Sequence, residues 1–295
     1  MAVVATGFFD GVHLGHRHVI ETLVRLAKER GDESLVVTFW PHPRTVLAGA
    51  GLTLLTAMEE KIAMLKELGV DRVEVVPFDA AFAAMNGRQY LAEIVKKRFG
   101  GRMVVLGYDN RIGCDGLCST DAADTARELG MDATVAESVQ VCGHVVSSSL
   151  IRRLIVSGDT VTAAMCLGRP YALEGTVVTG NRIGTSIGFP TANMEVRDAL
   201  KTIPARGVYA VRVRTVGGDF RGMTNIGVRP TVSGGEGDVT IETNIFDFDT
   251  QIYGRDIRVE FIEKIRDEVH FGSLDALVSQ LRNDEEQCKE KLLSL

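Results

Sequence analysis

Near the N-terminus the sequence contains Asp10-Gly11-Val12-His13-Leu14-Gly15-His16. This stretch follows a short apolar run at residues 3–6, typical of a buried strand, and precedes a helical apolar pattern that ends at Gly31. Because His13 and His16 are three residues apart at the start of that helix, we expect both imidazoles on one face. The helix N-terminus adds unpaired N–H groups and a partial positive charge. The combination predicts a site that binds a triphosphate while it reacts.

Glycines accompany the two histidines at Gly7, Gly11 and Gly15, where they allow a ligand to approach the backbone closely. The spacing matches neither the dinucleotide-binding Gly-x-Gly-x-x-Gly turn nor a Walker loop. In a chain with 6 His and 31 Gly, a His-x-Gly-His sequence is expected by chance far less than once. An ordinary loop with two surface histidines is therefore the weaker interpretation.

Strand and helix patterns alternate through the first 168 residues. We expect further strands at residues 34–39, 73–76 and 103–106, and further helices at 56–68, 88–98 and 120–129. The first of these helices is expected to open with a capping box formed by Thr56 and Glu59. Such alternation predicts an α/β domain on a parallel sheet.

The pattern changes at Leu167-Gly168-Arg169-Pro170. The segments that follow alternate with a period of two and are rich in β-branched residues: 175–179, 208–214, 239–245 and 257–261. They predict an antiparallel sheet closed into a small barrel, and an amphipathic pattern at 273–293 predicts a final helix. We therefore expect two domains, residues 1–168 and 169–295.

A glycine-rich segment early in the second half ends in Gly188-Phe189-Pro190-Thr191-Ala192-Asn193. A loop of this kind, which includes Gly180, can wrap around a nucleotide. Thr191 and Asn193 carry the oxygen ligands that Mg²⁺ prefers. For the glycines alone a series of barrel turns is the better explanation, whereas the tetrad Pro190–Asn193 favours a site.

Two further elements have chemistry that suits phosphate transfer. Ser147 and Ser148 can cap a helix or donate to a phosphate, and Arg152 can add a bidentate contact. Glu242 lies in a strand pattern, where a carboxylate that faces a pocket can take a proton from an attacking hydroxyl. Alone, each is better explained as an ordinary surface feature, a helix cap with a solvated arginine and a solvent-facing glutamate.

The net charge of −6 and the pI of about 5.6 argue against a nucleic-acid partner, which requires a basic face. No signal peptide and no membrane-spanning apolar run is found, so no membrane partner is expected. The five cysteines show no Cys-x-x-Cys pair and no disulfide framework, which favours the cytoplasm. Cys114 and Cys118 are expected to be free thiols rather than metal ligands. No feature predicts an oligomeric state.

Together these segments resemble the bacterial bifunctional riboflavin kinase/FAD synthetase family over nearly the whole chain. The first half contributes the opening signature at residues 6–16 and later segments at 39–43 and 147–152. The second half contributes residues 188–193, 225–231, Glu242, 246–249, 253–254, 265–268 and Phe271. The Pro-Thr-Ala-Asn tetrad is the most specific single element.

The resemblance implies a Rossmann-like nucleotidyltransferase domain followed by a small antiparallel β-barrel kinase domain with a C-terminal helix. The kinase would transfer the γ-phosphate of ATP to the 5′-hydroxyl of riboflavin, giving FMN and ADP, with Glu242 as the base. The first domain would then adenylylate FMN with a second ATP, giving FAD and pyrophosphate. His13 and His16 would stabilise charge on the phosphates and would not be nucleophiles.

The resemblance also assigns binding residues to each reaction. For adenylyl transfer, ATP and phosphate would be bound by Gly7, Asp10, Gly15, Asp109, Ser147, Ser148 and Arg152. For the kinase, ATP would be bound by Gly180, Gly188, Pro190, Thr191 and Asn193, with Thr191 and Asn193 as the Mg²⁺ ligands. The flavin would be bound by Arg266, Glu268 and Phe271.

The sequence departs from the family at five positions: Phe8, Asn110, Ile112, Leu150 and Asn244. The family usually has phenylalanines at the positions of Asn110 and Ile112, which motivates an alternative, a monofunctional riboflavin kinase with a degenerate first domain. A non-catalytic flavin-binding regulator and a class I aminoacyl-tRNA synthetase-like enzyme are further alternatives. Retention of Glu242 and Thr191 speaks against the regulator, and the acidic pI speaks against the synthetase.

Overall fold

The computed structural model describes residues 1–42, 53–180, 184, 187–229 and 238–293. Its Cα positions divide the chain into two compact units, Met1–Ser148 and Ser149–Leu295. This division, after Ser148, lies earlier in the chain than the boundary at 168/169 that the sequence pattern predicted. Helices α7 (Ser148–Ser157) and α8 (Thr160–Leu167) explain the difference, because Ala205 N–H donates to Ile155 O and Thr160 Oγ1 donates to Ile262 O within the second unit.

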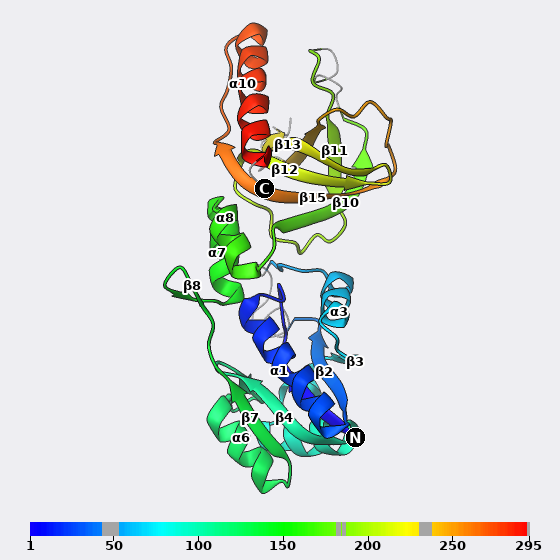
Figure 1. The fold of residues 1–295 in the computed structure, drawn as a ribbon, viewed down its shortest axis with the longest axis vertical. Helices are drawn as coiled ribbons and strands as arrows, with labels where there is room; N and C mark the ends of the chain where they lie inside the picture. The colour runs from blue at the N-terminus through cyan, green and yellow to red at the C-terminus, as the bar shows by residue number, and fades with distance from the viewer. Residues whose placement is uncertain (43–52, 181–183, 185–186, 230–237, 294–295) are drawn as a thin grey trace. The chain divides into compact units, whose positions relative to one another are not determined.

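The first unit is built on a five-stranded sheet in the order β3-β2-β1-β4-β7 (Figure 1). The strands are β1 (Ala2–Thr6), β2 (Glu33–Trp40), β3 (Arg72–Pro77), β4 (Gly101–Gly107) and β7 (Asp132–Ala136). All four pairings are parallel, which confirms the predicted α/β class. Strand β7 was not predicted, because its sequence Asp-Ala-Thr-Val-Ala carries little apolar pattern.

Both faces of this sheet are buried, as expected for a parallel sheet. Alternate residues of β1 point to opposite faces: Val3 packs in the cluster that contains Ile20 and Leu23, whereas Val4 packs in the cluster that contains Leu91. The elements around the sheet are α1 (Leu14–Arg30), α3 (Met58–Glu67), α4 (Ala80–Ala83), α5 (Gly87–Gln89), η1 (Tyr90–Arg98) and α6 (Ser119–Glu128). Two small hairpins pair β5 (Arg111–Ile112) with β6 (Leu117–Cys118) and β8 (Gln140–Val141) with β9 (His144–Val145).

Two predicted helices differ in detail from the structure. The capping box at Thr56 and Glu59 is wrong: α3 begins at Met58, and Glu60 Oε2 accepts from Ala57 N–H at 2.7 Å. The Thr56 hydroxyl is bonded to Asp10 instead, so it is not available as a cap. The segment predicted as one helix at 88–98 consists of α5 followed by η1, a nine-residue π-helix.

The second unit contains a closed barrel in the order β10-β11-β14-β13-β12-β15, as predicted. Its strands are β10 (Tyr171–Val178), β11 (Ala192–Val196), β12 (Gly207–Thr215), β13 (Gly218–Arg229), β14 (Asp238–Ile245) and β15 (Asp256–Arg266). Helix α10 (Leu274–Leu293) follows β15 and belongs to the same unit (Figure 1). It packs on the barrel through Cys288 and Leu292, which share a core cluster with Phe189, Val208 and Phe246.

Gly175 lies where neighbouring strands of the barrel approach each other closely. It pairs with Val196 of β11 and with Ile257 of β15. A Cβ atom there would lie 2.1 Å from Glu195 O, a backbone atom that cannot move without opening the β10–β11 pairing.

We therefore expect Gly175→Ala to destabilise the barrel by about 1–3 kcal/mol, because the added methyl group overpacks a backbone contact. Thermal unfolding of the full chain, followed by calorimetry, measures the shift of the barrel transition. Gly272→Ala is the control, because a Cβ at Gly272 meets no described atom within 4 Å. Equal melting of the two variants would contradict the expectation.

Candidate active sites

The first candidate site lies where the neighbouring strands β1 and β4 end. The strand order reverses between these two strands, and such switch points are where open α/β sheets bind ligands. Asn110 Nδ2 donates to Thr6 O at 2.8 Å and so links the loop after β4 to the end of β1. The predicted residues Gly7, Asp10, His13, Gly15 and His16 follow β1, and the exposed Asp109 follows β4.

The two histidines form a stacked pair at the start of α1. His13 is the N-cap, and its Nδ1 accepts from His16 N–H at 3.2 Å. The ring centroids are 3.6 Å apart with an interplanar angle of 16°. Because Nδ1 of His13 is an acceptor, the neutral imidazole carries its proton on Nε2. The N-cap bond therefore fixes the tautomer that offers an N–H donor.

The surroundings of His16 favour its neutral form. Burial, followed by the charges of His13 and Lys61, lowers the pKa of His16 well below its ordinary value. Its Nδ1 is buried without a hydrogen-bond partner among the described residues. The edge of Phe9 packs against the ring at 5.3 Å between centroids. His16 thus provides a neutral, fixed hydrogen-bonding group at neutral pH.

The turn between β1 and α1 has a strained backbone. Phe9, Gly11 and Val12 adopt φ values of 53°, 84° and 40°, in the left-handed region that non-glycine residues avoid. The buried carboxylate of Asp10 accepts from Leu55 N–H, Thr56 N–H and Thr56 Oγ1 at 3.0–3.2 Å. These bonds tie the turn to the segment before α3. Asp10 was expected to bind ATP or phosphate, whereas in the structure its hydrogen bonds hold the turn.

The glycines of the signature make room for side chains of the same turn. A Cβ at Gly7 would lie 3.2 Å from the Phe9 ring, and a Cβ at Gly15 would lie 3.2 Å from the His13 ring. Ser148 Oγ donates to Asp10 O at 2.9 Å, and Ser147 is half-buried beside it in sequence. Arg152 lies on α7 within the second unit.

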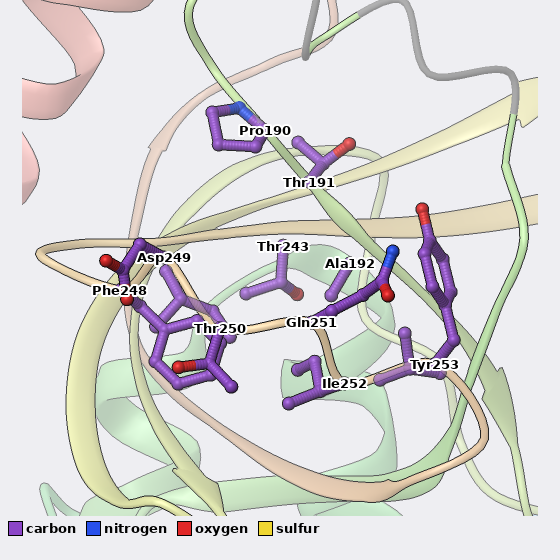
Figure 2. A pocket seen from close by; sticks show the side chains of 12 residues that line it. Pro190, Thr191, Ala192, Thr243, Phe248, Asp249, Thr250, Gln251, Ile252 and Tyr253 are labelled. Atoms are coloured by element: carbon purple, nitrogen blue, oxygen red, sulfur yellow. The ribbon is translucent and has the colours of Figure 1, made fainter.

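The second candidate site consists of two pockets in the barrel unit. The Glu242 pocket, about 280 Å³, is lined by Glu242, Thr191, Asn225, Arg266, Glu268 and Phe271, among others. The Tyr253 pocket, about 360 Å³, is lined by Pro190, Thr191, Phe248, Ile252 and Tyr253, among others (Figure 2). Phe248 and Tyr253 lie at opposite sides of it in this view. Thr191 borders both pockets, and this shared residue joins them.

Strand register places two asparagines beside Glu242. Asn193 of β11 and Asn225 of β13 are both paired with Glu242 of β14. Directly paired residues project from the same face of a sheet, so the carboxylate is flanked by amides. Gly180 allows this arrangement, because a Cβ there would lie 2.2 Å from the Asn193 amide nitrogen. Gly188 has a φ of 84°, which explains the glycine in the turn before Pro190.

The walls of the Glu242 pocket are held by polar contacts that the sequence did not reveal. Asn244 Nδ2 donates to Pro190 O at 2.7 Å and so fixes the backbone next to Thr191. Arg266 binds the fully buried Asp284 with Nε and Nη2 at 2.7–3.1 Å, and its Nη1 donates to Asp267 O. Asp284 lies on the apolar stripe of α10 with Leu281 and Cys288, and a carboxylate in that stripe is the sequence signal for this pair.

Comparison with known proteins gives a family for each half. Residues 1–150 match the model for FAD synthetase, and residues 167–292 match the model for riboflavin kinase. The chain is 34% identical to a bifunctional riboflavin kinase/FMN adenylyltransferase of Bacillus subtilis, over 97% of this chain and 91% of that protein. It is 35% identical to the protein of the same description from Escherichia coli K12, over 98% and 92%.

The chain belongs to the bifunctional riboflavin kinase/FMN adenylyltransferase family. It phosphorylates riboflavin to FMN with ATP, and it adenylylates FMN to FAD with release of pyrophosphate. The monofunctional, regulatory and synthetase-like alternatives are set aside. No helix in the described part of the chain is long and apolar enough to span a membrane.

A solved structure from Streptococcus pneumoniae has the same fold. It is described as a macrolide-efflux protein, is 30% identical, covers 98% of this chain and 94% of its own, and has a TM-score of 0.90. That description differs from the one that the family models and the curated relatives share.

Three of the positions that depart from the family make structural contacts in this chain. Ile112 is buried in the core cluster of the first sheet, and Asn110 links β4 to β1. Asn244 holds Pro190. The signature residues Pro43, Pro230 and Thr231 lie outside the described residues.

Two matched substitutions test these supports. Asn244→Ala should lower kcat/KM for riboflavin phosphorylation about 10- to 100-fold, because the segment that carries Thr191 loses its anchor. Asn110→Ala should lower kcat/KM for FMN adenylylation to a similar extent, because the bond from the loop after β4 to Thr6 O at the end of β1 is lost. Each variant is the control for the other, with both rates measured by chromatography on one preparation. An effect of either variant on both rates would contradict the local role.

Proposed function

We propose that each reaction uses its own side chains, Glu242 with Thr191 in the barrel unit and His13 with His16 in the first unit. The observation that supports the kinase assignment best is that Thr191 borders two pockets, one of which contains Glu242. A transfer between two substrates requires adjacent pockets for donor and acceptor. The residue at their border is then next to the transferred group.

In the proposed kinase reaction, riboflavin occupies the Glu242 pocket and ATP occupies the Tyr253 pocket. Glu242 takes the proton of the 5′-hydroxyl as its oxygen attacks the γ-phosphorus, and ADP leaves. Phe271 offers a ring to the flavin, and Glu268 offers a carboxylate. Arg266 lines the pocket while its guanidinium is bound to Asp284. Gly180, Gly188 and Pro190 shape the nucleotide side.

Thr191 and Asn193 fit Mg²⁺ by the chemistry of their donors. A hydroxyl and an amide carbonyl are hard oxygen ligands, and Mg²⁺ usually keeps waters and substrate phosphates in its remaining positions. The described residues contain no group of three or more His, Cys, Asp or Glu arranged to hold a metal, consistent with a metal held mainly by phosphates. When bound, Mg²⁺ neutralises charge on the β- and γ-phosphates.

In the proposed adenylyl transfer, a phosphate oxygen of FMN attacks the α-phosphorus of ATP. The bond from the α-phosphorus to the bridging oxygen breaks, and pyrophosphate leaves. His13 and His16 donate to the phosphate oxygens, together with the N–H groups at the start of α1. Gly7 and Gly15 keep the turn compact. Asp109, Ser147 and Ser148 of the same unit are proposed to complete the phosphate site.

ATP use and the acidic composition lead us to propose a cytoplasmic enzyme that has no nucleic-acid partner. The net charge of −6 offers no broad basic surface. Its binding partners are then riboflavin, FMN, FAD, the adenine nucleotides and pyrophosphate.

Glu242→Gln should lower riboflavin phosphorylation about 10²–10⁴-fold, because the amide cannot accept the proton, and should leave adenylylation of supplied FMN unchanged. His16→Ala should lower FMN adenylylation about 10²–10³-fold and should leave riboflavin phosphorylation unchanged. Chromatography of riboflavin, FMN and FAD measures both. Parallel loss of the two activities in either variant would argue against separate side-chain sets.

Removal of divalent metal with EDTA should stop phosphorylation, and Mg²⁺ should restore it. Thr191→Val should raise the Mg²⁺ concentration needed for half-maximal phosphorylation, because the hydroxyl ligand is lost at nearly constant volume. The Mg²⁺ requirement of adenylylation in the same variant is the control. An unchanged Mg²⁺ titration for phosphorylation would exclude Thr191 as a ligand.

A further inference from the structure

Lys61 is a buried lysine that the reactions described above do not use. It lies on α3 and is 2% exposed. Its Nζ donates to Phe8 O at 2.9 Å and to Thr38 Oγ1 at 3.2 Å, and lies 4.0 Å from the centroid of the Phe8 ring. The cation is therefore enclosed by α3, β2 and the turn that precedes the histidine pair.

This charge has no close counter-ion. Among the described residues, Lys61 makes hydrogen bonds and a ring contact but no ion pair, and Asp10 acts on it only through the electrostatic field. Burial lowers the pKa of Lys61 to about 8, although Asp10 raises it. A buried, unpaired ammonium is costly, so an apolar side chain of similar volume would serve packing better.

The contacts of Lys61 converge on the strained turn. Phe8 O is the acceptor for both Lys61 Nζ and Thr38 Oγ1, and it directly precedes Phe9, whose φ is 53°. The Phe8 ring also packs against His42, with centroids 3.8 Å apart. Lys61 thus fixes the start of the segment whose end positions His13 and His16.

The charge of Lys61 also reaches the histidine pair, because it contributes to the lowered pKa of His16. The titratable groups that act on Lys61 are Asp10 in the turn and His16 on α1, and His42 contacts the same Phe8 ring. A positive potential at this point favours the polyphosphate that is expected beside His16.

We propose that Lys61 is a positioning residue of the adenylyltransferase site, which holds the Phe8–Asp10 turn and adds positive potential to the phosphates without touching them. The proposal rests on the assignment of adenylyl transfer to His13 and His16. It adds a group that no signature of the sequence contains.

The charge state of Lys61 predicts how adenylylation and stability change with pH. Native Lys61 loses its proton as the pH rises through about 8, whereas the unfolded chain keeps this proton until the pH approaches 10.5. Adenylylation should therefore fall above pH 8. The unfolded state binds more protons there, so Lys61 makes stability rise with pH in the same window. Activity and stability change in opposite directions, which a purely structural role would not produce.

The test measures kcat/KM for FMN adenylylation from pH 6.5 to 9.5 for the full-length protein, Lys61→Met and Lys66→Met. Lys66 is the matched control, because it is exposed on the same helix. We expect the unaltered protein and Lys66→Met to lose activity above about pH 8. Lys61→Met should be about 10- to 100-fold slower at pH 7, and its activity should show no further loss above pH 8. Riboflavin phosphorylation by the same samples should stay within about twofold.

Three results would overturn the proposal. Lys61→Met could be as active as the control, Lys61→Met could lose activity above pH 8 as the control does, or the unaltered protein could show no loss above pH 8. The last measurement needs no variant, so the proposal is tested even if Lys61→Met does not fold. The variant His16→Ala shows whether a negative result concerns Lys61 alone or the assignment of adenylyl transfer to His13 and His16. If His16→Ala loses adenylylation and Lys61→Met does not, the site stands and the role of Lys61 is refuted.

Discussion

The hydrogen bonds of the buried Asp10 carboxylate are the constraint on which the first site depends. They join the turn after β1 to Leu55 and Thr56, residues far away in sequence. Each of the left-handed conformations at Phe9 and Val12 costs about 1–3 kcal/mol and would relax without such bonds. His13 would then not be placed as the N-cap of α1. The histidine pair is thus a product of tertiary structure as well as of local sequence, since its N-cap geometry requires the strained turn.

In the barrel the corresponding constraint is strand register. Closure pairs Glu242 with Asn193 on one side and with Asn225 on the other, so the three polar side chains share a face. A one-residue slip would send Glu242 to the opposite face. Gly175 and Gly180 belong to the same constraint, because each leaves space for a neighbouring strand or side chain. The glycines around this site therefore serve packing at least as much as ligand approach.

The sequence predicted the α/β unit, the barrel and the final helix, because strand and helix periodicities differ strongly. It also brought forward the residues that are proposed to carry the chemistry, since His, Glu, Thr and Asn in unusual patterns are visible without a structure. It did not reveal Thr56 as a partner of Asp10 or Asp284 as the partner of Arg266. Both contacts join distant segments, and periodicity reports only on neighbours along the chain. Strand β7 was missed because its apolar pattern is weak.

The departures from the family follow a physical division between reacting groups and their supports. Asn110, Ile112 and Asn244 contact backbone or core, and Phe8 packs on Lys61 and His42. A support can be replaced when another side chain holds the same backbone, because only the position of that backbone matters to the substrate. Glu242, as the proposed proton acceptor, would have no such substitute, since its chemistry would be the function. Retention of His13, His16, Thr191 and Glu242 beside altered supports is therefore what two working sites require.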